Sequence, residues 1–243
     1  MSTDDGHGHG QAKKLKLYSF WRSSCSFRIR FALNVKGLEY DLITINWFQG
    51  ENRKAEYLKI NPIGFVPALV DDDIVVADSF AIALYLEEKY PQQHPLIPRD
   101  LQKRAINYQV ATIVSSSIQP FQNLSGNRFM DDKISLDEKI DWIKAKIEKG
   151  LSALEKLLHD HAGKYATGDE IALGDVFLAP QIHAAISRFN VDMTKYPVLS
   201  RCYDGYNELP AFLNALPKNQ PDFPAMIMHT NEADFMKQLR GEN

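Results

Sequence analysis

The sequence predicts an α/β domain followed by an all-helical domain, and three observations lead to this prediction. Over roughly the first 90 residues, short alternating apolar runs typical of strands interchange with segments of helical spacing. A polar, proline-containing stretch at 92–99 then interrupts the pattern. After it, strand patterns nearly vanish and apolar residues recur at helical spacing. The 243 residues are enough to bury a sizeable core in two domains.

The first domain is expected to contain its elements in the order β-α-β-α-β-β-α. Residues 15–20 alternate as a half-buried strand does, and the pattern changes to helical at Cys25. Gly37 is suited to end this helix because glycine tolerates the left-handed conformation. The remaining elements are a strand at 40–45, a short helix near 52–58, an apolar run at 61–70 followed by a turn, a strand at 74–77 and a helix from 79 to about 90.

The second domain is predicted to be helical throughout, with helices at 105–114, 136–158, 176–189 and 202–209. The expected limits are a disordered tail at 1–14, a first domain at 15–92, a linker at 93–101, a helical domain at 102–230 and a frayed end at 231–243. His7 and His9 lie in the glycine-rich tail, where we expect disorder and no metal site.

Composition limits the classes of partner. A net charge of −3 gives no field that would gather nucleic acid. No apolar stretch approaches the roughly 20 residues that a membrane helix needs, and the polar, glycine-rich opening segment leads us to expect no secretory signal. Cys25 and Cys202 are far apart, so we expect no disulfide framework. These features favour a soluble cytoplasmic protein that acts on a small molecule and binds neither nucleic acid nor membrane.

The cluster Ser23-Ser24-Cys25 lies where the first strand turns into the first helix. Free amides and the helix dipole favour an anion there, and a hydroxyl can lower the pKa of a thiol by donating to its thiolate. One of the serines can equally be a simple helix cap. Cys25 occupies the position of a redox cysteine, but Phe27-Arg28 follows where a second thiol would be needed, so a packing role stays open.

Two further dipeptides have binding and structural interpretations. A cis Val66-Pro67 bond would present the Val66 backbone to an added peptide, whereas an isolated X-Pro pair is most often trans. Asp78-Ser79 begins a helix directly after a strand. Its hydroxyl and amides suit a carboxylate and its charge suits an ammonium, although capping alone also explains it. Sites for a thiolate, a peptide backbone and an amino-acid end, in this order, together describe glutathione.

Residues 23–33, SSCSFRIRFAL, resemble the signature SSCx[W/H]RVRIAL of the zeta-class glutathione transferases. Phe27 stands where tryptophan or histidine is usual, which changes packing and removes no chemical group. The resemblance extends from about residue 15 to about 221 and implies a thioredoxin-like glutathione-binding domain with a cis Pro67, a helical substrate domain and a homodimer. Within the stretch 118–124 it places Gln119 and Asn123 at the glutathione cleft.

The resemblance also implies roles in catalysis. Ser23 would stabilise the glutathione thiolate, with Ser24, Cys25 and Arg28 close by, and Arg188 would meet a substrate carboxylate. From its position alone, Arg188 would be a solvated residue near a helix C-terminus. One family feature is missing. Ala172 replaces the serine or threonine of a capping box, which is expected to weaken that helix start by about 1 kcal/mol.

The activity that the resemblance implies is glutathione-dependent isomerisation of maleylacetoacetate to fumarylacetoacetate in tyrosine and phenylalanine catabolism. Transferase activity and dechlorination of dichloroacetate are expected side activities. Two alternatives remain at this point. One is a thiol-disulfide oxidoreductase that uses Cys25 with glutathione, and the other is a transferase-like binding module without catalysis.

Overall fold

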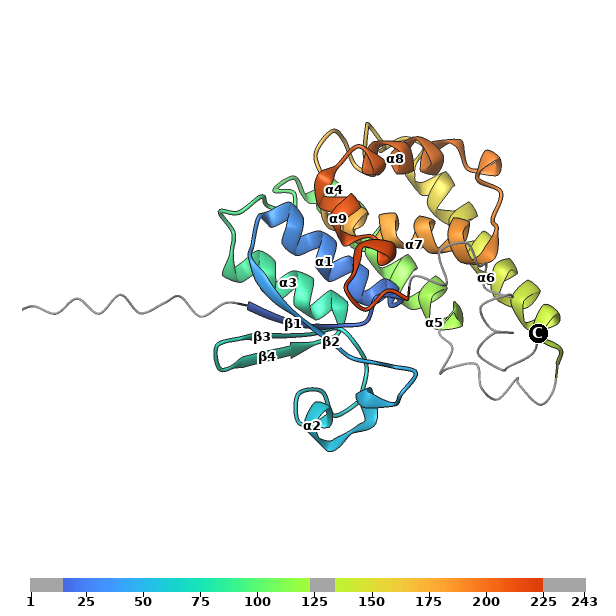
Figure 1. Cartoon of the computed structure of the whole chain (residues 1–243). Coiled ribbons are helices and arrows are strands. Elements are labelled where there is room, and N and C mark those ends of the chain that lie inside the picture. Colours follow the sequence, from blue (N-terminus) through green and yellow to red (C-terminus); the bar gives the residue numbers. More distant parts are fainter. Residues whose placement is uncertain (1–14, 123–133, 225–243) are drawn as a thin grey trace, which may run out of the picture.

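The computed structural model describes residues 15–122 and 134–224 (Figure 1). His7, His9 and Asn123 lie outside the described residues. The first domain has the predicted element order, with a short 3-10 turn η1 added before the second helix. Its elements are β1 (Leu15–Ser19), α1 (Ser24–Lys36), β2 (Tyr40–Thr44), η1 (Glu51–Arg53), α2 (Ala55–Leu58), β3 (Ala68–Asp71), β4 (Ile74–Ala77) and α3 (Ser79–Lys89).

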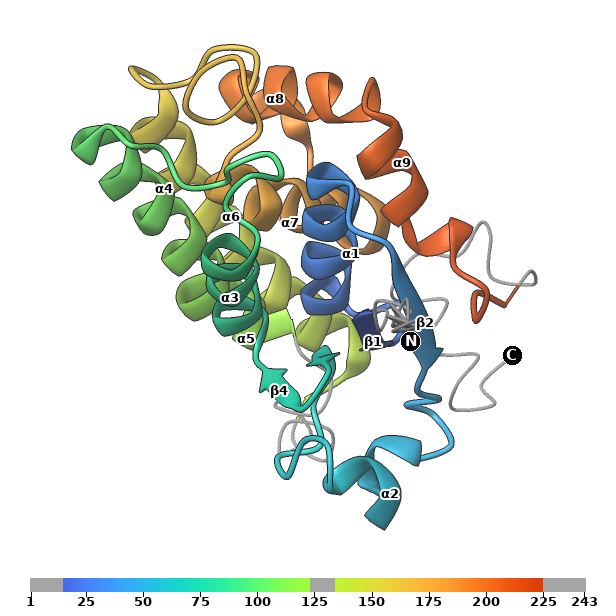
Figure 2. The same ribbon diagram turned by 90° about the vertical axis from the view of Figure 1, so that its left-hand side faces the viewer.

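The four strands form one mixed sheet in the order β2-β1-β3-β4. Strands β1 and β2 are parallel, while β3 pairs antiparallel with both β1 and β4. Helices α1 and α3 lie on the face of the sheet that meets the helical domain, and α2 lies on the other side (Figures 1 and 2). This is the thioredoxin-like arrangement expected from the sequence.

Local chemistry explains both ends of α1. Ser23 has extended backbone angles, and its side chain accepts a hydrogen bond from the Ser26 amide, so Ser23 is the N-cap. The helix therefore begins at Ser24, one residue before the predicted start. Gly37 ends it with a φ of 65°, as predicted, and its amide bonds to carbonyls of the last turn.

Among its described residues the second domain contains helices and connecting loops, with one isolated β-bridge between Tyr165 and Gly168. It contains α4 (Leu101–Thr112), a π-helical segment η2 (Ile113–Ile118), α5 (Gln119–Gln122), α6 (Leu136–Leu158), α7 (Leu173–Phe189), η4 (Met193–Lys195), α8 (Pro197–Asn207), α9 (Pro210–Ala215) and η5 (Pro217–Asn219). Helix α7 begins three residues before its predicted start and α8 five before. Helix α9 was not predicted, because at six residues it is too short for a helical period to show.

The start of α7 shows how the missing capping hydroxyl is replaced. The amide of Gly174 donates to the side-chain oxygen of Asn107 at 2.7 Å, and the amide of Leu173 donates to the carbonyl of Leu96 at 2.7 Å. The Asp175 carboxylate still accepts from the Ala172 amide at 2.9 Å. The free amides of this helix end are thus paired by neighbouring segments, which offsets the weakening expected from Ala172.

The larger hydrophobic core runs through both domains, and a smaller cluster around Trp21 and Tyr57 lies in the first domain. The larger core joins residues of β1 and α1, such as Leu17 and Phe31, to residues of α4, α6 and α7. Helix α7 is buried over most of its surface and packs against α1, α4 and α8. No helix among the described residues has the length and apolar character needed to span a bilayer. The shared core fixes the two domains relative to each other and so defines the space between them.

Candidate active site

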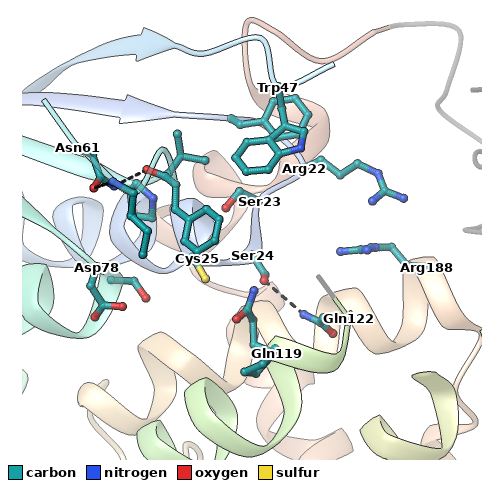
Figure 3. Close-up of a pocket in the computed structure, with 17 residues that line it drawn as sticks. Arg22, Ser23, Ser24, Cys25, Trp47, Asn61, Asp78, Gln119, Gln122 and Arg188 are labelled. Carbon is teal, nitrogen blue, oxygen red and sulfur yellow. Dashed lines mark hydrogen bonds between the residues drawn. The ribbon is translucent and has the colours of Figure 1, made fainter. Parts of the chain in front are cut away.

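A cavity of about 450 Å³ lies between the two domains. The turn after β1, the loop before Pro67 and the start of α3 contribute from the first domain, and α5 and the end of α7 contribute from the second (Figure 3). The lining residues are Phe20, Arg22, Ser23, Ser24, Cys25, Trp47, Asn61, Ile63, Phe65, Val66, Pro67, Asp78, Ser79, Gln119, Pro120, Gln122 and Arg188. The cavity thus brings together almost all of the site residues predicted from the sequence.

The two serines of the β1–α1 turn both reach the cavity, and each uses its oxygen as an acceptor. Ser23 Oγ accepts from the Ser26 amide at 3.1 Å, and Ser24 Oγ accepts from the Gln122 side chain at 3.3 Å. Ser23 therefore caps the helix and lines the cavity at once. Among the described residues neither hydroxyl donates a hydrogen bond, so both protons remain available to an anion in the cavity.

Gln122 is a site residue that sequence reasoning missed. It is 2% exposed, lies at the end of α5 and lines the cavity. The stretch 118–124 was singled out, but only Gln119 and Asn123 were assigned there. The π-helical segment η2 directly precedes α5, and an extra residue in a helical turn rotates all later side chains. A regular helical spacing drawn from α4 therefore could not predict which glutamine faces the first helix.

The β1–α1 turn is held by a buried arginine of α1 and by two residues near the end of the described chain. The fully buried Arg30 donates to Ser19 Oγ at 2.9 Å and to the Ala215 carbonyl at 3.1 and 3.2 Å. Burial lowers its pKa to about 10, so the group stays charged near neutral pH. The Trp21 amide donates to the Asp222 carboxylate at 3.0 Å. Phe223 packs edge-on against the Trp21 ring. These contacts hold the serines in place.

The Val66-Pro67 peptide bond is cis, as the resemblance implied. The carbonyl just before it, that of Phe65, accepts from the Asn61 side chain at 2.7 Å and from the Tyr57 hydroxyl at 2.5 Å. None of the hydrogen bonds formed within the described residues uses the Val66 amide or carbonyl. The Val66 backbone thus borders the cavity with its donor and acceptor free for a peptide.

At the start of α3 the roles of the two polar residues differ from the simple capping interpretation. Asp78 is the N-cap, with its carboxylate accepting from the amides of Phe80 and Ala81 at 2.8 and 3.2 Å. Ser79 is the first helical residue, and its buried hydroxyl accepts from Arg28 at 3.0 Å. Both residues line the cavity, where the exposed Asp78 carboxylate adds negative charge.

Arg28 is the predicted site residue whose position differs most from the expectation. It was placed beside the thiolate, but it is 2% exposed, does not line the cavity and lies over the Phe177 ring at 4.6 Å. It donates from Nη1 to the Ser79 hydroxyl at 3.0 Å. Phe27 is also buried and stacks on Phe212, so the aromatic position of the motif belongs to the core between the domains.

Cys25 and Arg188 complete the predicted set. Cys25 is half-buried and lines the cavity, and it forms no disulfide. Arg188, in the last turn of α7, also lines the cavity, and its guanidinium is on the same side as that of Arg22 (Figure 3). Two arginines at one mouth suit a substrate with carboxylates. No cluster of three or more metal-binding side chains lies within 15–122 and 134–224.

Comparison with known proteins agrees with this geometry. The model of the glutathione S-transferase N-terminal domain matches residues 13–88, and that of the C-terminal domain matches residues 122–205. A zeta-class glutathione S-transferase from Euphorbia esula is 61% identical over 209 residues, which cover 86% of this chain and 92% of that protein. The chain belongs to the zeta class of the glutathione S-transferases.

Other members of the family extend the comparison to named activities. The maleylacetoacetate isomerase of Rattus norvegicus is 42% identical over 219 residues, 89% of this chain and 99% of that protein. The solved structure of a maleylacetoacetate isomerase from Anaeromyxobacter dehalogenans, with glutathione bound in its active site, has a TM-score of 0.78 and 36% identity and covers 87% of this chain and 98% of that one. This chain is therefore a member of an enzyme class.

Proposed function

We propose that this zeta-class glutathione S-transferase binds glutathione in the cavity between its domains and isomerises maleylacetoacetate to fumarylacetoacetate. The named relatives support the class of reaction, and the lining of the cavity supports the residue roles. The observation that carries the proposal is the pair of serine hydroxyls, Ser23 and Ser24. Each accepts one hydrogen bond from the protein and keeps its proton for the cavity.

The rest of the cavity matches the parts of glutathione in order. The free backbone of Val66, beside the cis Pro67, suits the cysteinyl peptide unit. Asp78 and Ser79 suit the ammonium and carboxylate of the γ-glutamyl end, and Gln119 faces the same ligand from the helical domain. The sulfur then lies beside the β1–α1 turn. We keep Asn123 as a predicted contact, because it lies outside the described residues.

The chemistry requires a thiolate near neutral pH. Hydrogen bonds donated to the charged form lower a thiol's pKa, so Ser23 and Ser24 favour ionised glutathione. The thiolate adds to the cis alkene of the substrate, forming a C–S bond while the electron pair moves to the conjugated carbonyl. The former double bond rotates, the electrons return, and the thiolate leaves a trans alkene. Glutathione is regenerated, and no oxidant or reductant is consumed.

Arg188 is the proposed partner of a substrate carboxylate, since it lines the cavity on the side away from Asp78 (Figure 3). The same thiolate can displace chloride from a small haloacid, so dechlorination of dichloroacetate is a proposed side activity. We further propose a role in tyrosine and phenylalanine catabolism, a cytoplasmic location and a homodimer. Cell fractionation tests the location, and light scattering of the purified protein tests the dimer.

The direct test is an assay with maleylacetone, a substrate analogue. We expect rapid cis-trans conversion only when glutathione is present, with the glutathione concentration unchanged at the end. Consumption of glutathione in proportion to product would indicate conjugation and contradict the isomerase proposal. Retention on immobilised glutathione without any conversion would instead support the non-catalytic binding module.

A second candidate is supported by the position of Cys25, which lines the same cavity and is half-buried. In that case the Cys25 thiolate attacks a disulfide that contains glutathione, expels the other half as a thiol and keeps glutathione as a mixed disulfide. A second glutathione thiolate then releases Cys25 and forms glutathione disulfide. The Cys25→Ser variant separates the two functions. Loss of disulfide reduction with retained isomerisation would assign the two reactions to different groups, whereas loss of isomerisation would give Cys25 a part in the main reaction.

A further inference from the structure

We propose that Gln122 is a positioning residue that turns the Ser24 hydroxyl toward the glutathione sulfur. The inference rests on the proposed function, because it names the group that sets up one of the two hydroxyl donors. Gln122 acts through Ser24 and is not required to touch the substrate. Its role is to donate a hydrogen bond to the Ser24 oxygen, so that the Ser24 hydroxyl proton points toward the glutathione sulfur.

The inference begins from a buried chain of three side chains on three elements. Gln181 of α7 donates from Nε2 to Gln122 Oε1 at 3.0 Å, and Gln122 of α5 donates from Nε2 to Ser24 Oγ at 3.3 Å. Their exposed fractions are 1%, 2% and 9%, respectively. Figure 3 shows the last link, from Gln122 to Ser24, at the floor of the cavity. The chain therefore begins in the core and ends at the site.

The direction of the hydrogen bonds follows from how the Gln181 and Gln122 amide groups are placed. An amide has one oxygen that accepts and one nitrogen that donates, so a Gln122 oxygen occupied by Gln181 leaves its NH₂ group facing Ser24. Ser24 must then accept. Its single proton points away from Gln122, and Ser24 lines the cavity. A hydroxyl held in this way donates to a thiolate without first breaking a bond to the protein.

A purely structural role for Gln122 has different consequences. Gln122 belongs to the helical domain and Ser24 to the first domain, so their bond also ties the domains together. A tie alone would change the stability of the protein, and it would leave the pKa of bound glutathione unchanged. The pKa of the bound thiol is therefore the measurement that distinguishes positioning from mere attachment.

The experiment compares the wild type with Gln122→Met, which keeps the length of the side chain and removes the donor. Bound glutathione is titrated by the ultraviolet absorbance of its thiolate, and turnover of maleylacetone is followed across pH. We expect the thiol pKa to rise by about half to one unit, which lowers the ratio of thiolate to thiol at a given pH by about threefold to tenfold. Turnover should fall accordingly and recover at higher pH.

A double-mutant cycle tests whether Gln122 acts through Ser24. Because Gln122 has no other route to the sulfur in this proposal, adding Gln122→Met to Ser24→Ala should change the thiol pKa no further. The matched control is Gln119→Met, an amide-to-thioether change in the same cavity. It lacks the bond to Ser24, so we expect its effects, mainly on glutathione affinity, to add to those of Ser24→Ala.

A second variant keeps the test decisive if Gln122→Met does not fold. Gln122→Leu removes the same donor without adding a charge, so the Ser24 hydroxyl loses its fixed direction and the thiol pKa should rise by a similar amount. An unchanged thiol pKa in a folded Gln122 variant, or full additivity with Ser24→Ala, would overturn the inference. Failure of the wild type to bind glutathione would instead overturn the proposed function, so the two failures are distinguishable.

Discussion

Two polar clusters, one on α1 and one on α7, differ in how fully their polar groups are hydrogen-bonded within the protein. The Asp175 cluster is enclosed, and its carboxylate accepts from the Ala166 and Ala172 amides and from the Tyr206 hydroxyl. The serine cluster, Ser23 and Ser24, faces a cavity, and neither hydroxyl donates a hydrogen bond to any residue of 15–122 or 134–224. The enclosed cluster stabilises the fold, and the open one is available for chemistry.

The largest effect is expected when the enclosed cluster loses its centre. Asp175→Ala leaves two buried amides and the buried Tyr206 hydroxyl without their acceptor, and each unpaired group costs about 1–3 kcal/mol. We expect a loss of about 4 kcal/mol in the free energy of unfolding, measured by urea denaturation. A loss below about 1 kcal/mol would mean that water replaces the carboxylate and that the cluster is not closed.

The same cluster predicts a dependence of stability on pH. Burial, opposed by the Tyr206 hydrogen bond, raises the pKa of Asp175 from 3.8 to about 6. The folded state thus holds this proton more tightly. The contribution of this protonation to the free energy of unfolding is complete below pH 3.8 and is lost as the pH rises through 6. The loss reaches about 3 kcal/mol, at about 1.4 kcal/mol per pKa unit.

The comparison for this prediction is Asp175→Asn, which cannot titrate. Urea denaturation of both proteins between pH 4 and 7 should show that the wild type loses stability relative to the variant as the pH rises. Parallel curves for the two proteins would show that Asp175 titrates alike in the folded and unfolded states.

The open cluster should respond more strongly in turnover than in stability. Ser23→Ala removes a hydroxyl donor to the thiolate, and removal of such a donor commonly lowers turnover about 100-fold. Steady-state kinetics with maleylacetone should show this loss, while calorimetry should show nearly unchanged glutathione affinity. Because Ser23 also caps α1, a stability loss of about 1 kcal/mol is expected as well. An unchanged rate would remove Ser23 from the mechanism.

Arg188 extends the comparison to the substrate side of the cavity. Arg188→Gln keeps a polar side chain and removes the charge, so we expect KM for maleylacetone to rise about tenfold with little change in kcat, because the lost contact is made in substrate and transition state alike. A defect confined to kcat would contradict carboxylate binding as its role.

The two cysteines give the smallest and simplest measurement. Cys202 lies in α8 near the enclosed cluster, and burial, with a further contribution from the Asp175 charge, raises its pKa to about 12. Cys25 lines the open cavity. Native protein should react with one equivalent of a thiol reagent, at Cys25, and unfolded protein with two. Bound glutathione should slow the reaction of Cys25 in the native protein. If glutathione protected only Cys202, the result would contradict both the buried position of Cys202 and the position of Cys25 in the cavity.

The sequence predicted the fold where local chemistry decides it. Three features depend on nearby residues, and the structure confirms each of them. They are the strand pattern around Leu17, the end of α1 at Gly37 and the helical spacing of apolar residues along the whole of α6. The replacement of a capping hydroxyl by Asn107 was not predictable, because that residue is 67 positions away from Gly174. Only the packing of α4 against α7 brings the two together.

The candidate site shows the same division. The order of Ser23, Val66-Pro67 and Ser79 indicated a glutathione-like ligand, and all of them line the cavity. Arg28 was assigned by its place in a motif, but its actual neighbours are Ser79 and the Phe177 ring. Gln122 lay in the stretch 118–124 but was given no role, since the π-helical segment before it shifts which side chain faces α1. How deeply a side chain is buried, and which way it faces, depend on tertiary packing.

The contact between Trp21 and the pair Asp222 and Phe223 joins positions about 200 residues apart. During synthesis the first domain leaves the ribosome long before residue 222 does, and domains generally begin folding as they emerge. The thioredoxin-like domain can therefore form its core early, while the turn that carries the serines still lacks its contacts with Asp222 and Phe223. A nascent chain stalled before residue 222 would be folded in part and still unable to hold its reactive turn in place.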